Sequence, residues 1–161
     1  MKDKVDSSRA RSDAEVITAS RFFDGSVLRG PTAVRVHKGL VESIEDHRGP
    51  CEHYLLSPGF LDLQMNGFDA VSCAGSGAGI TAAELAELDS MLLARGTTRW
   101  LATLVTDDLG RVVSRTDSVR AAASGAPGCL GVHLEGPFLG SKLGAHDRAR
   151  AVSYTHLTLP T

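Results

Sequence analysis

Short runs in which apolar and polar residues alternate occupy the first third of the chain. The runs at residues 33–37 and 40–44 flank Lys38 and Gly39, after a first apolar pair at residues 16–17. Strict alternation is typical of a strand with one buried face, and two such strands around a two-residue turn form a hairpin. We therefore predict a small β-domain over residues 15–57.

A second kind of strand pattern follows the Pro-Gly pair at residues 58–59. Strand alternation places Asp62, Gln64 and Asn66 on one face. The other face carries large apolar residues: Leu61, Leu63 and Met65. This pattern suggests a barrel strand, with its apolar side against helices and its polar side toward the barrel interior.

The pattern then becomes helical. Residues 68–80 are rich in Gly, Ala and Ser and are expected to form a loop, after which Thr81 and Glu84 match a capping box for a helix that runs to about Arg95. A strand is predicted at residues 100–105, and residues 106–108 are expected to cap a second helix. The expected apolar face of that helix consists of Leu109, Val112, Val113, Thr116 and Val119. With a third strand ending at Glu135, the order strand, helix, strand, helix, strand predicts an α/β fold with a parallel sheet.

Glu135 ends a short apolar strand immediately before Gly136 and Pro137. A carboxylate in such a setting needs a metal, a basic side chain or backbone amides as a partner, and a simple salt-bridged or capped acid is one reading. Gln64 and Asn66 also fall at a strand's carboxyl end, where active sites of α/β folds gather. These three side chains are therefore expected at one site.

Composition narrows the class of protein. The chain has 161 residues, 17 basic and 19 acidic side chains and a formal net charge of −2, so no bulk attraction to nucleic acid or membrane is expected. The three cysteines are far apart, and no stretch resembles a signal peptide or a membrane span, which favours a cytoplasmic location. Residues 1–14 are charged and polar and are expected to be a disordered extension.

Four segments together resemble a known family. They are the run from Ser57 to Gly67, Gly96-Thr97-Thr98, residues 103–106 (Thr-Leu-Val-Thr), and the run from Gly131 to Phe138 that contains His-Leu-Glu-Gly-Pro. The first resembles the amidohydrolase superfamily, and the last resembles, within it, the N-acetylglucosamine-6-phosphate deacetylases. The resemblance implies a metal-dependent hydrolase of the TIM-like (β/α)₈ barrel type, of which residues 58–151 would form the first part, preceded by part of a small β-sandwich domain.

The resemblance also implies a metal site. Glu135 would be a ligand of one catalytic divalent ion, expected to be Zn²⁺, together with two histidines from later strands. Many amidohydrolases carry His-x-His where this sequence has Gln64 and Asn66; neutral amides are poor zinc ligands, so one ion is expected and not two. Alternatively, the two amides merely satisfy strand-end hydrogen bonds. His133, two residues before Glu135, is expected to support the pocket without binding the metal.

Ala145 and His146 resemble the family's pair that contacts the sugar phosphate, although a lone loop histidine is otherwise expected to face solvent. Asp147 replaces the asparagine commoner in the family. The implied substrate is a small amino sugar phosphate, N-acetylglucosamine 6-phosphate, which would be deacetylated to glucosamine 6-phosphate and acetate. The family further implies a homodimer.

A complete (β/α)₈ barrel takes about 250 residues, so only its first part is expected here. The family's two histidine ligands, its catalytic aspartate and a phosphate-binding arginine have no counterparts in this sequence, so we expect this fragment to be inactive by itself. Residues 152–161 resemble the conceptual translation of a sequencing-library adapter and are expected to be a non-native tail. Two alternatives stay open: another amidohydrolase, such as a dihydroorotase-like enzyme or a nucleobase deaminase, or a non-catalytic barrel that serves as a binding module.

Overall fold

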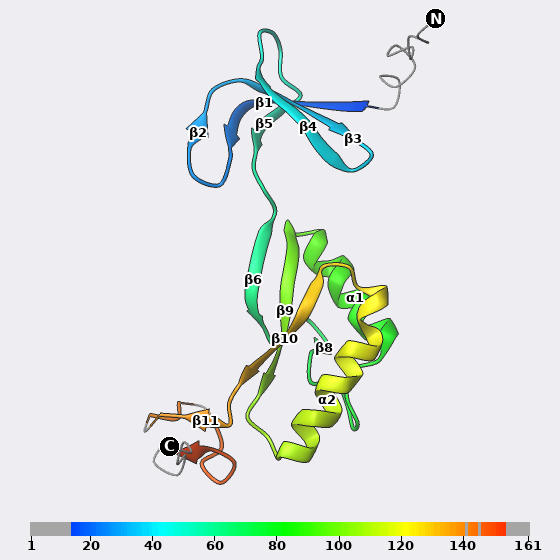
Figure 1. The fold of residues 1–161 in the computed structure, drawn as a ribbon, viewed down its shortest axis with the longest axis vertical. Helices are drawn as coiled ribbons and strands as arrows, with labels where there is room; N and C mark the ends of the chain where they lie inside the picture. Colours follow the sequence, from blue (N-terminus) through cyan, green and yellow to red (C-terminus); the bar gives the residue numbers. More distant parts are fainter. Residues whose placement is uncertain (1–13, 141, 145, 154–161) are drawn as a thin grey trace, which may run out of the picture. The chain divides into compact units, whose positions relative to one another are not determined.

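The structure, a computed structural model, describes residues 14–140, 142–144 and 146–153. The chain divides into two compact units, one up to Pro58 and one from Gly59 onward (Figure 1). In the part of the chain that the structure describes, neither helix is long and apolar enough to cross a membrane. The expected N-terminal extension lies outside the described residues, except for Ala14, which is paired with His37 in the sheet of the first unit. Residues 154–161 of the expected non-native tail also lie outside them.

The first unit is a sheet of five strands. They are β1 (Ala14–Phe23), β2 (Leu28–Arg29), β3 (Thr32–His37), β4 (Leu40–Asp46) and β5 (His53–Leu56). The order is β2-β1-β3-β4, and β5 pairs in parallel with β1. The predicted hairpin is confirmed, since β3 and β4 are antiparallel around Lys38 and Gly39. Among residues 14–58, the buried apolar side chains are Ala19, Phe22 and Val34.

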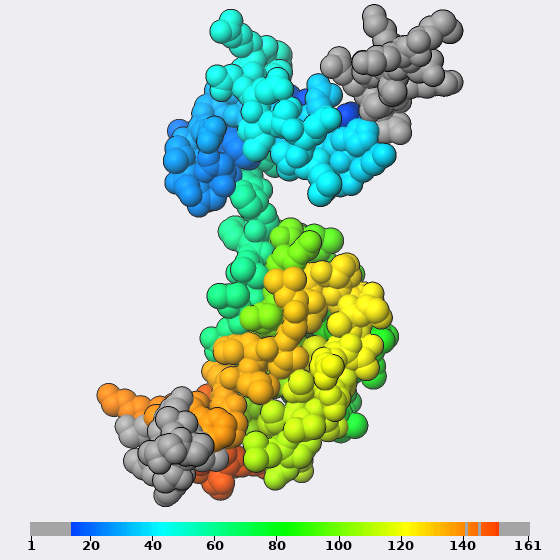
Figure 2. All heavy atoms as spheres, viewed as in Figure 1, coloured from blue at the N-terminus to red at the C-terminus, as the bar shows by residue number. Residues whose placement is uncertain are grey.

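The second unit contains a parallel sheet of three strands with the order β10-β9-β6. Its elements are β6 (Phe60–Met65), β7 (Gly67–Phe68), β8 (Val71–Ser72), α1 (Ala82–Leu93), β9 (Thr97–Val105), α2 (Leu109–Ala122), a 3₁₀ turn (Ala123–Gly125), β10 (Cys129–Glu135), β11 (Phe138–Leu139) and β12 (Val152–Ser153). The predicted alternation of strands and helices is thus confirmed. Both helices lie beside β9, and the space-filling view shows α2 and β10 as one continuous packed surface (Figures 1 and 2).

The helix starts form as the sequence predicts. Thr81 accepts a hydrogen bond from the Glu84 amide while the Glu84 carboxylate accepts one from the Thr81 amide, which is the reciprocal capping box. Asp108 caps α2 by accepting from the Gly110 amide. The helices pack on β9 around Trp100, whose indole nitrogen donates to Asp89 at 2.8 Å. The core is completed by Cys73, Ile80, Leu85, Leu88, Leu92, Ala102, Val119, Ala122 and Ala126.

Three local expectations were wrong. Leu61 and Leu63 were expected to meet helices, but they are 55% and 59% exposed, because α1 and α2 pack on β9 and leave the edge strand β6 largely uncovered. Leu109 and Val113, predicted on the buried face of α2, are both 60% exposed, because they line an open hollow beside Leu134 of β10 that no described element fills. The expected loop at residues 68–80 contains part of the β7–β8 hairpin, which is held by the Cys73 amide donating to the Asn66 carbonyl.

Candidate functional site

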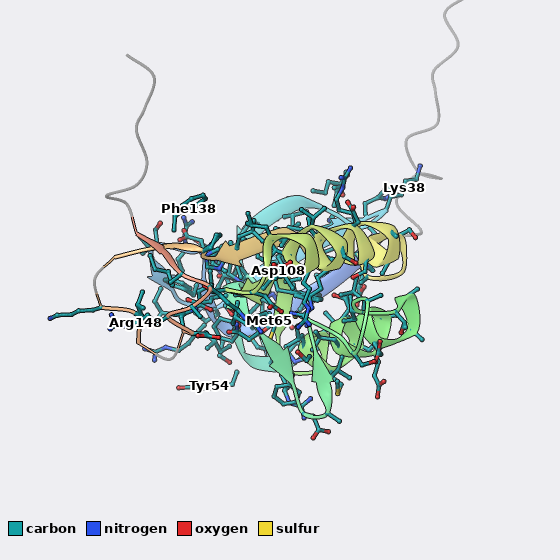
Figure 3. The ribbon with its side chains drawn as sticks, turned by 90° about the horizontal axis from the view of Figure 1, so that it is seen from below. Lys38, Tyr54, Met65, Asp108, Phe138 and Arg148 are labelled. Carbon is teal, nitrogen blue, oxygen red and sulfur yellow. The ribbon has the colours of Figure 1, made fainter. Side chains whose placement is uncertain are left out.

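The carboxyl ends of β6, β9 and β10 lie at the same end of the sheet, seen from below in Figure 3, where Met65, Asp108 and Phe138 are labelled. Parallel pairing causes this arrangement, since every strand then points the same way. Glu135 pairs with Val105 in the ladder of β10 and β9. The strand ends therefore bring together side chains that are about 70 residues apart in the sequence.

Gln64, Asn66 and Glu135 meet at this end, as the sequence predicts. Gln64 Nε2 donates to Glu135 Oε1 at 2.9 Å, and Asn66 Nδ2 donates to Glu135 Oε2 at 3.5 Å. The first is a good hydrogen bond to a charged acceptor, whereas the second is at the limit of the range. Each carboxylate oxygen thus faces an amide from the β6 end, so the two amides orient the carboxylate.

His146 comes to the same carboxylate from the segment after β11. Its Nε2 lies 3.6 Å from Glu135 Oε1, with side chains that are 16% and 28% exposed respectively. Both residues line a hollow of about 310 Å³ with Val105, Thr106 and Asp147. His146 therefore lies beside Glu135, while its contact with a substrate stays a prediction. Ala145, the other expected substrate contact, lies outside the described residues.

His133 lies two residues before Glu135 on β10. Its Nδ1 is 3.4 Å from Thr103 Oγ1 on the neighbouring strand β9, a contact between two side chains within the sheet. This position agrees with its expected place beneath Glu135, while its supporting role stays a prediction.

The backbone at Glu135 is fixed by Thr106, which the sequence predicted in a helix cap and within a family-like segment but not in contact with Glu135. Thr106 Oγ1 donates to the Glu135 carbonyl at 3.0 Å. Gly136 allows this approach: its φ is +139°, and a Cβ there would stand 2.0 Å from Thr106 Oγ1. The sequence signal for this contact was the glycine directly after the acid.

Asp107 was also missed. Its side chain is 6% exposed and accepts hydrogen bonds from the Asp108 amide and from Arg115 Nη1, at 2.8 and 2.7 Å, and a further one from Arg150. The Asp108 amide, followed by the neighbouring guanidinium groups, holds the pKa of Asp107 below its usual range. A buried acid with cationic partners is a fixed anion, which here anchors the segment after β11 to the end of β9.

A metal ion at this site would need several ligands close together. Over residues 14–140, 142–144 and 146–153, no three His, Cys, Asp or Glu side chains come close enough together to hold an ion. Glu135 is a carboxylate at the hollow, and His146 adds one imidazole nearby. Since a catalytic zinc ion takes three protein ligands, the described residues fit part of such a site, with Glu135 as the ligand they offer.

No protein-family model matches the chain. Among curated proteins, the N-acetylglucosamine-6-phosphate deacetylase of Bos taurus is 36% identical over 164 residues, covering 90% of this chain and 38% of that protein. The Rattus norvegicus enzyme of the same name is 30% identical over 169 residues, covering 91% and 40%. The chain therefore spans about 40% of the length of the curated relatives it matches.

Solved structures of deacetylases with the same name also match the chain. The N-acetylglucosamine-6-phosphate deacetylase of Thermotoga maritima matches with a TM-score of 0.72 at 22% identity, over 88% of this chain and 38% of that one. A mutant of the Mycobacterium smegmatis enzyme in complex with N-acetyl-D-glucosamine-6-phosphate matches with a TM-score of 0.66 at 24% identity, over the same shares. The chain thus has the fold of part of these deacetylases. Its sequence relatives show that it belongs to the N-acetylglucosamine-6-phosphate deacetylase family.

Proposed function

We propose that the protein containing this chain hydrolyses the acetamide of N-acetylglucosamine 6-phosphate to give glucosamine 6-phosphate and acetate. One observation carries the proposal: Glu135 meets Gln64, Asn66 and His146 at the carboxyl end of the parallel sheet. The names of its relatives, and the sugar phosphate bound in the Mycobacterium smegmatis structure, support this substrate. In this proposal the three parallel strands are the first three of a (β/α)₈ barrel.

The reaction needs a water made nucleophilic near neutral pH and a group that stabilises the negative charge on the carbonyl oxygen. A divalent ion, zinc by expectation, supplies both when bound. Glu135 would hold that ion, and the remaining ligands would come from outside the described residues. Gln64 and Asn66 then orient Glu135 through their amide donors, and their neutral side chains argue for one ion and not two.

In this proposal the sugar phosphate binds in the hollow beside Glu135. His146 lines it with an imidazole that can donate a hydrogen bond to a hydroxyl or phosphate oxygen, and Thr106 and Asp147 also line it. The proposal gives substrate contact to His146 and to Ala145. His133 would support the strand end from the sheet through its contact with Thr103.

The direct test is acetate release by the full-length protein supplied with zinc. Glu135→Gln keeps the shape of the side chain but removes its charge, and we expect it to lower activity by more than about a hundredfold, since even groups around the ligands contribute 10–100-fold. Glu87→Gln, on the exposed side of α1, is the matched control and should retain activity. The 161-residue chain alone should release no acetate above a zinc-only reaction. Full activity of Glu135→Gln would refute the proposal.

Another amidohydrolase activity and a non-catalytic binding module are the competing functions. Assays with dihydroorotate and nucleobases as alternative substrates distinguish another amidohydrolase activity from the deacetylase. The gene sequence after residue 151 distinguishes a binding module from the deacetylase, because a catalytic barrel requires two strand-end histidines and a later aspartate. The homodimer and the cytoplasmic location stay predictions, the former checked by light scattering of the full-length protein.

A further inference from the structure

Asp107 joins two parts of the second unit that are distant in sequence. It lies two residues beyond the end of β9, and its buried carboxylate receives the Asp108 amide and the Arg115 guanidinium from α2. Its third partner, Arg150, is 43 residues away in the segment after β11. This contact ties that segment to the end of the sheet.

Arg150 also forms an ion pair with Asp147. Its Nε lies 3.5 Å from Asp147 Oδ2, and Asp147 Oδ1 accepts from the Ala149 amide at 2.9 Å. The amides of Arg150 and Ala151 both donate to the Asp147 carbonyl, at 3.1 and 3.2 Å. Residues 147–151 therefore form a closed turn that one guanidinium fastens to Asp107.

His146 is the residue directly before this turn, so the position of the turn sets the distance between His146 and Glu135. The contact of these two side chains, 3.6 Å, is longer than a normal hydrogen bond and is too weak to hold the segment. Hydrogen bonds between a guanidinium and a buried carboxylate are much stronger. Apart from the pairing of β12 with β11, the segment is thus held through Arg150 and not through the site itself.

We propose that Asp107 is a positioning residue that acts through Arg150: it fastens the turn at residues 147–151 and so keeps His146 beside Glu135 in the hollow. The catalytic part of this inference rests on the proposed function. In it, Asp107 and Arg150 affect substrate binding although neither residue contacts the substrate. The fastening itself is a property of the chain without any ligand.

Amide hydrogen exchange in the ¹⁵N-labelled chain tests the fastening. Asp107→Asn and Arg150→Gln should each speed exchange at His146, Ala149, Arg150 and Ala151 by about tenfold, the effect expected from losing one charge-assisted hydrogen bond. Exchange in α1 should not change. Asp117→Asn is the control, because Asp117 pairs with the exposed Arg120 at 3.7 Å on the same helix, α2, that supplies Arg115. Arg150 is on the surface, so its variant tests the proposal even if Asp107→Asn unfolds.

Unchanged exchange of the turn in Arg150→Gln would overturn the proposal, as would equal acceleration in the turn and in α1. In the full-length protein, Arg150→Gln should raise KM for N-acetylglucosamine 6-phosphate by about tenfold with a smaller change in kcat, and Arg150→Lys, which keeps the charge, should recover part of the loss. If the wild-type protein is active and the KM of Arg150→Gln equals the wild-type KM, the positioning role fails while the proposed function stands. If the wild-type protein has no deacetylase activity, the proposed function fails and the catalytic role of Asp107 fails with it, whatever the exchange data show.

Discussion

The two units of the chain bury their apolar residues to different degrees. In the second unit α1 and α2 cover β9, and Trp100, Leu85 and Leu88 are completely buried. In the first unit only Ala19, Phe22 and Val34 are buried among the described apolar residues, and its sheet carries an open apolar hollow of about 380 Å³. The hollow is lined mainly by Ile17, Phe22, Val34, Val36, Val41, Ile44 and Leu56.

The difference follows from what each segment of sequence supplies. An amphipathic helix that follows a strand can pack on the sheet which that strand joins. Two successive pairs of strand and helix can therefore enclose a core that is built from contiguous sequence. A sheet of hairpins brings no second layer with it. The candidate site belongs to the unit with the closed core, where rigid strand ends can fix the side chains at Glu135.

The largest expected effect is on the core of the second unit. Leu88→Ala should lower the free energy of unfolding of that unit by about 2–5 kcal/mol, because it opens a cavity among fully buried neighbours. Trp100, the one tryptophan of the chain, reports the transition by fluorescence in urea. Leu93→Ala, on the exposed side of the same helix, is the control and should change stability by less than about 0.5 kcal/mol. Equal losses in the two variants would mean that the core is not closed as described.

Much of this core could be predicted from the sequence because its signals are local. The capping box of Thr81 and Glu84, and the apolar spacing of Leu85, Leu88 and Leu92, lie within one helix. The strand ends that carry Gln64, Asn66 and Glu135 follow from alternation and parallel order, and their meeting follows from the same two features.

What could not be predicted depends on contacts that are distant in sequence. The errors at Leu61 and Val113 have one cause: the pattern shows that a side chain is apolar, but not whether another element covers it. The Asp107 and Arg150 pair spans 43 residues, and no local pattern marks either residue as a partner of the other. Sequence reasoning therefore found the side chains of the site but not the contacts that hold its outer segment.

The second prediction concerns the hairpin beside the site. Gly67 has a φ of +148°, and a Cβ there would stand 2.5 Å from the Val71 carbonyl oxygen. Gly67→Ala should therefore destabilise the second unit by about 1–3 kcal/mol, the usual range for forcing a side chain into such a conformation. Urea unfolding followed by Trp100 fluorescence measures it. Gly140→Ala, with open space around its Cβ, is the control; matching midpoints for both variants would contradict the described hairpin.

A smaller effect is expected in the core of the first unit. Val34→Ala removes two buried methyl groups and should cost about 1.5 kcal/mol at roughly 0.8 kcal/mol for each buried carbon. Exchange of the β3 amides should speed up accordingly, while the Trp100 transition of the second unit should stay in place. Val41→Ala, exposed on β4, is the control. A shift of the Trp100 transition by the same amount would show that the two units unfold together and would remove the distinction between them.

The smallest effect is a pH dependence confined to the turn between β1 and β2. The Val27 and Ser26 amides, followed by Arg29, lower the pKa of Asp24 from 3.8 to about 2. Because the folded pKa lies below the unfolded value, the carboxylate contributes stability above about pH 4 and loses that contribution as the pH falls toward 2. The Ser26 and Val27 amide signals should report this loss by NMR in an acid titration. Asp24→Asn should abolish the response, whereas Asp46→Asn, exposed in the same sheet, should retain it. A response that survives in Asp24→Asn would mean that another group stabilises the turn. The first unit, whose sheet is open, would then depend less on Asp24 and its turn for stability than we expect.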